Sequence, residues 1–182
     1  LAKPQVIENI HEAYLEAVTP WVRQLLENPL VPKVAQNAQF DVLFLRAHYG
    51  IRVEPITFDT MTAHHTVYPE LPKSLETLAS LYTNEPYYKD LSRIPPELWE
   101  YNARDAVVTY ECYQALEGEL REDGVEEFYG EYVLPLIDPL MEMQEKGVCV
   151  NVAEREVVAR VLTDEVADAQ AALNGEALGW QG

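Results

Sequence analysis

The chain has 182 residues, enough for one sizeable domain with an appendage, and its 31 acidic and 13 basic side chains give a net charge of −18. This charge argues against a module that binds nucleic acid through clustered Lys and Arg, but not against a nuclease, because metal ions can bridge two negative partners. No apolar run approaches the roughly 18 residues of a membrane-spanning helix, and two cysteines without a CxxC pair argue against structural zinc and fit a reducing cytoplasm.

The first part of the chain is predicted to be helical. Apolar residues at helical spacing predict a helix over 5–18, and Thr19-Pro20 is expected to begin a new helix that ends at Asn28-Pro29. Residues 31–35 are then predicted to form a short buried strand. A helix over 38–48 follows. Its expected apolar stripe consists of Phe40, Leu43, Phe44 and Ala47, and its expected end is Gly50.

The middle of the chain contains two clear helix starts. Asp59 is expected to open a short helix after an extended stretch, and Ser74 is expected to cap the helix of SLETLASLY. The adjacent His64 and His65 point to different faces of a helix, so we interpret them as surface or packing residues and not as metal ligands. Tyr87, Tyr88 and Lys89 lie in a polar and aromatic loop and could touch a nucleotide strand, although such tyrosines more often simply pack.

The last third is predicted to be mainly helical. Pro95-Pro96 is expected to begin a long helix, and the acidic stretch after Gly118 is interpreted as a domain boundary. An amphipathic helix over 132–146, a short strand over 148–151 and a further helix over 152–173 complete the predicted elements. The absence of an initial methionine suggests a partial chain.

Two polar pairs stand out because each has an aspartate four residues after a polar residue: Asn37 with Asp41, and Tyr101 with Asp105. On a helix, such a pair lies on one face. Taken alone, Asp41 is best explained as an acid near a helix N-terminus. Asp105 lies among apolar neighbours in mid-helix, which is unfavourable unless the carboxylate is paired or bound to a metal. Together the two aspartates suggest divalent-metal ligands, with Tyr101 orienting a metal-bound water.

Four stretches carry a resemblance to a known family. NAQFDVLFLRAHYGI (residues 37–51) and YNARDAVVTY (101–110) resemble the second and third motifs of the 3′-5′ proofreading exonuclease domain of family A DNA polymerases, the bacterial DNA polymerase I type, phage enzymes included. FDTM and LPKSLETLASLY resemble the segments between these motifs. YVLPLIDPLMEMQEKGVCVN (132–151) resembles the segment that joins the exonuclease to the polymerase thumb. The resemblance covers nearly the whole chain from Val18, with its motifs in family order and spacing.

This resemblance implies an α/β, ribonuclease-H-like exonuclease fold and two-metal hydrolysis with Mg²⁺ or Mn²⁺. Asp41 and Asp105 would be metal ligands, Tyr101 would position the attacking water, and Asn37 would contact the 3′-terminal nucleotide or orient Asp41. The implied domains are 1–122, an exonuclease part, and 123–182, a linker and the start of a polymerase thumb. The implied partners are the single-stranded 3′ end of DNA and a downstream polymerase domain. The implied location is the cytoplasm of a bacterial or phage-infected cell, with no membrane partner.

The chain departs from the family in one respect: no aspartate has an acid two residues later, so the first D-x-E motif is absent. In the family this motif lies upstream, on the first strands of the sheet. We therefore expect an N-terminally truncated, mostly helical fold with half of the acids of the metal site. An upstream segment or another chain would supply the D-x-E motif, and this chain alone would have weak or no nuclease activity.

Three other readings remain open. The chain is alternatively a noncatalytic structural or docking remnant of a replication protein, which the presence or absence of an upstream D-x-E segment would decide. An RNA-trimming enzyme of the same superfamily would differ only in substrate, and the thumb-like tail argues against it. An unrelated helical interaction protein would have to explain four motif matches as accidents.

Overall fold

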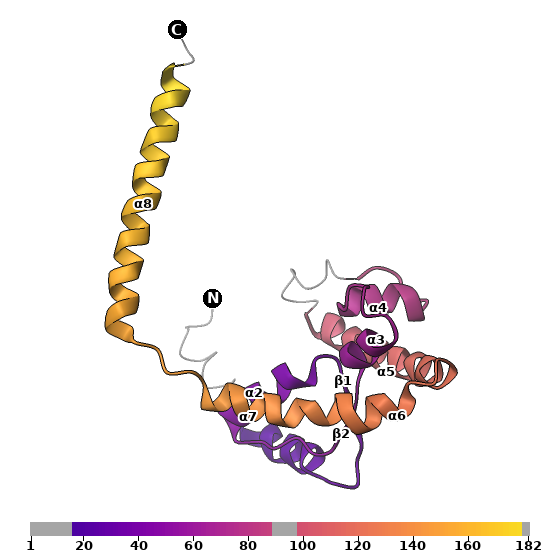
Figure 1. Cartoon of the computed structure of the whole chain (residues 1–182). Coiled ribbons are helices and arrows are strands. Elements are labelled where there is room, and N and C mark those ends of the chain that lie inside the picture. Colours follow the sequence, from indigo (N-terminus) through magenta and orange to yellow (C-terminus); the bar gives the residue numbers. More distant parts are fainter. Residues whose placement is uncertain (1–15, 89–97, 180–182) are drawn as a thin grey trace, which may run out of the picture. The chain divides into compact units, whose positions relative to one another are not determined.

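The structure is a computed structural model that describes residues 16–88 and 98–179. The predicted helix over 5–18 lies almost wholly outside the described residues, and so do Pro95-Pro96. The chain divides into two compact units, residues 1–145 and 146–182. Figure 1 shows the helices and strands of both units. Among the described residues, no helix is long and apolar enough to cross a membrane.

The first unit contains a small βαβ arrangement. Strand β1 (Lys33–Ala35) leads into helix α2 (Ala38–Tyr49), and strand β2 (Ile56–Asp59) returns parallel to β1, with Val34 opposite Phe58. A helix between two parallel strands is the ordinary crossover, because parallel neighbours cannot be joined by a tight turn. Helix α2 ends as predicted at Gly50, whose φ of 61° lies in the left-handed region that glycine tolerates.

Most of the remaining described residues of this unit are helical. The helices are residues 16–26, α3 (Thr60–Val67), α4 (Leu75–Tyr82), α5 (Leu98–Glu122), the short α6 (Glu126–Phe128) and α7 (Ile137–Lys146). A π-helical turn (Tyr129–Val133) and a 3₁₀ turn (Leu134–Leu136) lead into α7. The two predicted helix starts are confirmed: the side chain of Asp59 accepts a hydrogen bond from the Thr62 N–H at 3.0 Å, and Ser74 Oγ accepts one from the Thr77 N–H at 3.2 Å. The fold is therefore predominantly helical α/β with a small parallel sheet.

Helix α5 forms the centre of the main hydrophobic core. Its apolar residues at positions 108, 112, 116 and 120 recur every fourth residue and are almost fully buried. They pack against residues from β2, α3 and α4 and against two tyrosines; the buried partners are Phe58, Ala63, Leu78, Ala79, Tyr88 and Tyr129. A second cluster, composed of Val42, Val53, Ile137 and Met141, joins α2 to α7. The long helix α5 is thus held along its length.

The second unit consists mainly of helix α8 (Val152–Gly179), which confirms the predicted helix from residue 152. The Asn151 side chain accepts a hydrogen bond from the Glu154 N–H at 3.2 Å at the helix start. The predicted strand over 148–151 is wrong, since these residues have no regular structure. A strand forms only where its backbone finds a partner, and no pairing of this segment is present in the described chain.

Two further predictions are wrong. Residues 16–26 are one continuous helix, so Thr19-Pro20 does not begin a new one; contacts such as the bond from Arg23 to the Tyr49 carbonyl hold this helix despite its proline. Helix α5 continues through Gly118 to Glu122, because Leu116 and Leu120 on either side of the glycine are buried. The domain boundary predicted in this acidic stretch stays a prediction.

The predicted apolar stripe of α2 is the second wrong prediction. Phe40 is 67% exposed and Phe44 is 47% exposed, whereas Ala38 and Val42 are buried. Both sets recur at helical spacing, so periodicity alone could not choose between them. Packing against the second core cluster selects the face that carries Val42.

His64 is a packing residue, as predicted: its side chain is fully buried, and its Nδ1 lies 2.9 Å from the Tyr82 hydroxyl oxygen. Its Nε2 is buried without a hydrogen-bond partner among the described residues. Burial disfavours the charged imidazolium and lowers the pKa of His64 below its ordinary value of 6.5. The folded state therefore holds the neutral ring, and the unfolded state binds the proton more readily.

This burial predicts a pH-dependent stability. As the pH falls below about 6.5, the free energy of unfolding is expected to decrease, because protonation then favours the unfolded chain. The loss should stop below the lowered folded-state pKa. Urea unfolding between pH 7.5 and 5 measures this decrease in the free energy of unfolding. The substitution His64→Gln should make the decrease smaller. The matched control is His65→Gln, since His65 is adjacent but exposed; an equal effect of both substitutions would contradict the assignment to His64.

Candidate functional site

A cavity of about 470 Å³ brings together three of the four residues singled out in the sequence. Its wall combines the end of β1, the first turn of α2 and the middle of α5. The lining residues are Val34, Ala35, Gln36, Asp41, Leu75, Tyr101, Asp105, Ala106 and Thr109. Two aspartates 64 residues apart in sequence therefore face one space together with a tyrosine.

Helix α5 supplies Tyr101 and Asp105, and their spacing of four residues places both on one helix face, as predicted. Both side chains are half-buried. The burial of Val108 and Cys112 in the core fixes the rotation of the helix about its axis. Consequently the face that carries Tyr101 and Asp105 is turned toward the cavity.

Asp41 lies in the first turn of α2, and a buried carboxylate anchors the start of that helix. Asp59 Oδ2 accepts a hydrogen bond from the Ala38 N–H at 2.5 Å, while Oδ1 caps α3. The Tyr129 hydroxyl accepts a bond from the Asp59 N–H at 2.8 Å. Asp59, at the end of β2, thus links the N-termini of α2 and α3 through hydrogen bonds. This link fixes the position of Asp41 in the first turn of α2.

The Asp41 side chain is exposed enough to meet a ligand, and no described residue donates a hydrogen bond to its carboxylate. Partial burial, and secondly the negative charge of Asp59, raise the pKa of Asp41 above its ordinary value of 3.8. Both causes disfavour an unpaired carboxylate at this position. A bound cation would relieve both, which is the electrostatic condition expected of a metal ligand.

Asn37 is not brought to this cavity. It precedes α2 with φ 63° and ψ 52°, in the left-handed region, so the expectation that it shares a helix face with Asp41 is not met. Asn37 lines a different hollow of about 380 Å³, together with Phe40, Leu43 and Phe44 of α2.

Asp105 has a partner that the sequence did not reveal. The Tyr88 hydroxyl donates a hydrogen bond to Asp105 Oδ1 at 2.6 Å, and Tyr88 is only 5% exposed. Burial, and secondly this bond, raise the pKa of the Tyr88 phenol well above its ordinary value of 10, so it remains a donor at neutral pH. Two features of the sequence could have indicated this partner. A carboxylate in the middle of a helix, such as Asp105, needs a hydrogen-bond partner, and the preceding loop contains two tyrosines.

The donor set of the cavity suits a hard divalent cation. Carboxylate oxygens are the ligands that Mg²⁺ takes from proteins, often only one or two of them, with water and phosphate oxygens completing the shell. The cavity contains two such carboxylates, and no group of three or more acidic, histidine or cysteine side chains suited to a metal occurs in residues 16–88 and 98–179. Asp41 and Asp105 therefore fit a partial metal site.

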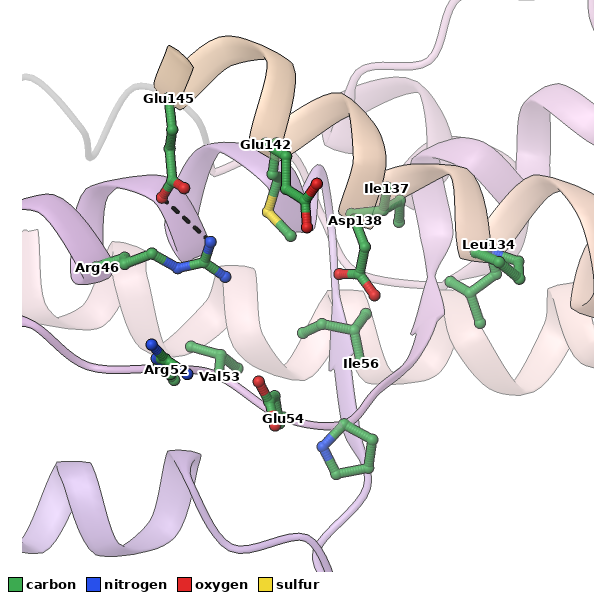
Figure 2. A pocket seen from close by; sticks show the side chains of 13 residues that line it. Arg46, Arg52, Val53, Glu54, Ile56, Leu134, Ile137, Asp138, Glu142 and Glu145 are labelled. Atoms are coloured by element: carbon green, nitrogen blue, oxygen red, sulfur yellow. Dashed lines mark hydrogen bonds and ion pairs between the residues drawn. The ribbon is translucent and has the colours of Figure 1, made fainter.

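A larger cavity of about 740 Å³ lies between the loop before β2 and helix α7 (Figure 2). Arg46 of α2 and Glu145 of α7 form an ion pair of 3.1 Å at its wall. Glu54, Asp138 and Glu142 also line it, yet these acids form no metal-binding group in the described part of the chain. None of the residues predicted from the sequence lines this cavity, so it is not the candidate site.

The chain is similar to known proteins in sequence and in structure. Residues 7–121 match the 3′-5′ exonuclease family of DNA polymerase A. The chain is 30% identical over 167 residues to DNA polymerase I of Synechocystis, with 82% of the chain covered, and 28% identical over 158 residues to DNA polymerase I of Chloroflexus aurantiacus, with 78% covered. It spans only 17% and 16% of the lengths of these two relatives.

Among solved structures, the chain is similar to the POL domain of Pol1 from M. smegmatis in complex with DNA primer-template and dNTP. The TM-score is 0.63 at 23% sequence identity, and the match covers 83% of this chain and 25% of that chain. At this identity the likeness shows a shared fold.

Proposed function

Because this chain belongs to the 3′-5′ exonuclease family of DNA polymerase A, we propose that it carries part of a proofreading site that removes 3′-terminal nucleotides from DNA. The observation that carries this proposal is the single cavity lined by Asp41 of α2 and by Tyr101 and Asp105 of α5. Similarity to DNA polymerase I over about four fifths of the chain supports it.

The cofactors we propose are two Mg²⁺ or Mn²⁺ ions, with Asp41 and Asp105 among their ligands. When bound, such ions stabilise developing negative charge on a phosphodiester and lower the pKa of water. The two carboxylates of this cavity are half of the acids that a complete site needs. The other half would come from a D-x-E motif on an upstream segment or on another chain.

The remaining side chains would act on substrate and water. The Tyr101 hydroxyl would orient the water that attacks the terminal phosphodiester. The Asp105 carboxylate, one turn away on the same face of α5, would bind the metal ion beside that water. Asn37, at the start of α2, would contact the 3′-terminal nucleotide from the adjoining hollow.

The proposal extends to the whole chain. We assign residues 1–122 to a ribonuclease-H-like exonuclease part and residues 123–182 to a linker and the start of a polymerase thumb. Within the described residues, β1 pairs only with β2, so one edge of β1 is left for upstream strands. The proposed partners are a single-stranded 3′ end of DNA and a downstream polymerase domain, and the proposed location is the cytoplasm.

A second candidate function is a noncatalytic structural or docking module of a replication protein. The observation that favours it is the small number of acids, since only two carboxylates of the described residues line the cavity. Such a module would keep the fold and the core around α5 without hydrolysing DNA. The two functions differ in one measurable property, the release of nucleotides.

The test is incubation of the full chain with a single-stranded oligonucleotide labelled at its 5′ end, with Mn²⁺ or with a chelator. Exonuclease function predicts a ladder of products shortened from the 3′ end that forms only with Mn²⁺ and not on a 3′-blocked oligonucleotide. Products from internal cleavage, or activity in the chelator, would contradict it. Absence of hydrolysis despite Mn²⁺ binding, also when the D-x-E segment is supplied, would favour the noncatalytic module.

Tyr101→Phe tests the proposed role of the tyrosine. In the intact enzyme, which also contains the D-x-E segment, we expect kcat to fall about 100-fold with KM nearly unchanged, because a misplaced nucleophile costs rate and not ground-state binding. Steady-state kinetics of nucleotide release measure both constants. The matched control is Tyr110→Phe, on the same helix but 54% exposed, which should change neither. A large rise in KM with kcat retained would assign Tyr101 to substrate binding instead.

A further inference from the structure

Two adjacent residues of α5 hold the loop that follows α4. Arg104 forms an ion pair with Glu85, and Asp105 accepts the hydrogen bond from the Tyr88 hydroxyl at 2.6 Å. The loop residues 83–88 therefore contact α5 at two points. Both contacts lie on the helical turn that carries Asp105. Arg104 also pairs with Glu100, one turn earlier on α5, at 2.8 Å.

The ring of Tyr88 has little freedom to move. It belongs to the main core cluster with Leu78, Ala79 and Val108. Its centroid lies 5.9 Å from that of the Tyr101 ring at an interplanar angle of 52°, and the Arg104 guanidinium carbon lies 6.0 Å from it. The hydroxyl is thus a fixed donor at a fixed place, touching one of the two aspartates of the cavity and packed against its tyrosine.

We infer that Tyr88 is a positioning residue for Asp105. Its hydroxyl donates a hydrogen bond to one carboxylate oxygen of Asp105 and so fixes the orientation of the carboxylate plane toward a divalent cation. This inference rests on the proposed function. The last torsion of an aspartate is broad and poorly fixed by itself, so a rigid donor on Oδ1 narrows the directions that the carboxylate can take. Partners of this kind commonly change metal affinity or activity by 10–100-fold.

Tyr88→Phe separates this role from simple packing, because it keeps the ring in the core and removes only the hydroxyl. The matched control is Tyr82→Phe. Tyr82 also lies beside the main core cluster and its hydroxyl is bonded to His64 Nδ1 at 2.9 Å, but Tyr82 does not line the cavity. Each substitution removes one hydroxyl, so both variants should show similar thermal unfolding midpoints.

The experiment measures the Mn²⁺ dissociation constant of the full chain by electron paramagnetic resonance for the wild type, Tyr88→Phe, Tyr82→Phe, Asp105→Asn and the double variant Tyr88→Phe/Asp105→Asn. We expect Tyr88→Phe to weaken Mn²⁺ binding about ten-fold and Tyr82→Phe to leave it unchanged. In the Asp105→Asn background, Tyr88→Phe should cause no further weakening, because the carboxylate through which it acts is gone.

The outcomes distinguish the two proposals. Wild-type affinity in Tyr88→Phe together with weakened binding in Asp105→Asn would overturn the positioning role and leave the metal site standing. Wild-type affinity in both variants, or no Mn²⁺ binding by the wild-type chain, would overturn the metal site and the positioning role together. Equal weakening by Tyr82→Phe and Tyr88→Phe would show a general structural effect and would also overturn the positioning role.

Discussion

Asp59→Ala is expected to lower the free energy of unfolding by about 3–5 kcal/mol, the largest loss of stability that we predict for a single polar side chain. Asp59 is 1% exposed, and its two carboxylate oxygens accept hydrogen bonds from the Ala38 and Thr62 N–H groups. Hydrogen bonds to a charged group contribute about 1.5–3 kcal/mol each, and the substitution leaves both donors without this acceptor. Equilibrium urea unfolding measures the loss.

Ser74→Ala is the matched control, because Ser74 caps α4 in the same way but at an exposed position and with one bond of 3.2 Å to the Thr77 N–H. Loss of an ordinary N-cap costs about 1 kcal/mol. A loss of similar size for Asp59→Ala and Ser74→Ala would show that Asp59 is an ordinary cap and not the joint between α2 and α3.

The position of Asp59 connects stability to the candidate site. Asp41 lies in the first turn of α2, one turn from the Ala38 N–H that Asp59 holds. Loosening that turn would move one carboxylate of the cavity while leaving Asp105 on α5 in place. Asp59 is therefore a residue that the site depends on, although it does not line the cavity.

Local signals in the sequence were sufficient for much of the fold. The end of α2 at Gly50 and the starts of α3 and α4 at Asp59 and Ser74 were predicted, because each depends on a backbone conformation or a cap within a few residues. The continuous helix over 16–26 and the exposure of Phe40 were not predicted, since they depend on packing between distant segments.

Only part of the candidate site could be predicted from local signals in the sequence. The i, i+4 spacing of Tyr101 and Asp105 places both on one face of α5, and the structure shows both at one cavity with Asp41. The hydrogen bond from Tyr88 to Asp105 could not be predicted, because it joins a loop without periodicity to a helix 17 residues away. The left-handed backbone of Asn37 likewise removed it from the helix face that its spacing had suggested.

Asp105→Asn is expected to have the largest functional effect. The substitution keeps the shape of the side chain and an oxygen that can accept the Tyr88 hydrogen bond, so the fold around α5 should be retained. It removes the negative charge that a divalent cation requires. We expect Mn²⁺ affinity to fall at least about 100-fold, and any release of 3′ nucleotides to fall about 1,000-fold, which corresponds to about 4 kcal/mol of lost transition-state stabilisation.

Asp123→Asn is the control for this prediction, because Asp123 is an exposed aspartate that does not line the cavity, and the same isosteric change there should alter neither quantity. Isothermal titration with Mn²⁺ measures the affinity of all three proteins, and labelled single-stranded oligonucleotides measure their rates. Since Asp105→Asn retains an acceptor for Tyr88, an unchanged unfolding midpoint with lost Mn²⁺ binding would assign the effect to charge. Unchanged Mn²⁺ binding in Asp105→Asn would exclude Asp105 as a ligand. Asp41 would then be the one carboxylate ligand left among the described residues of the cavity, which is too few for the proposed chemistry.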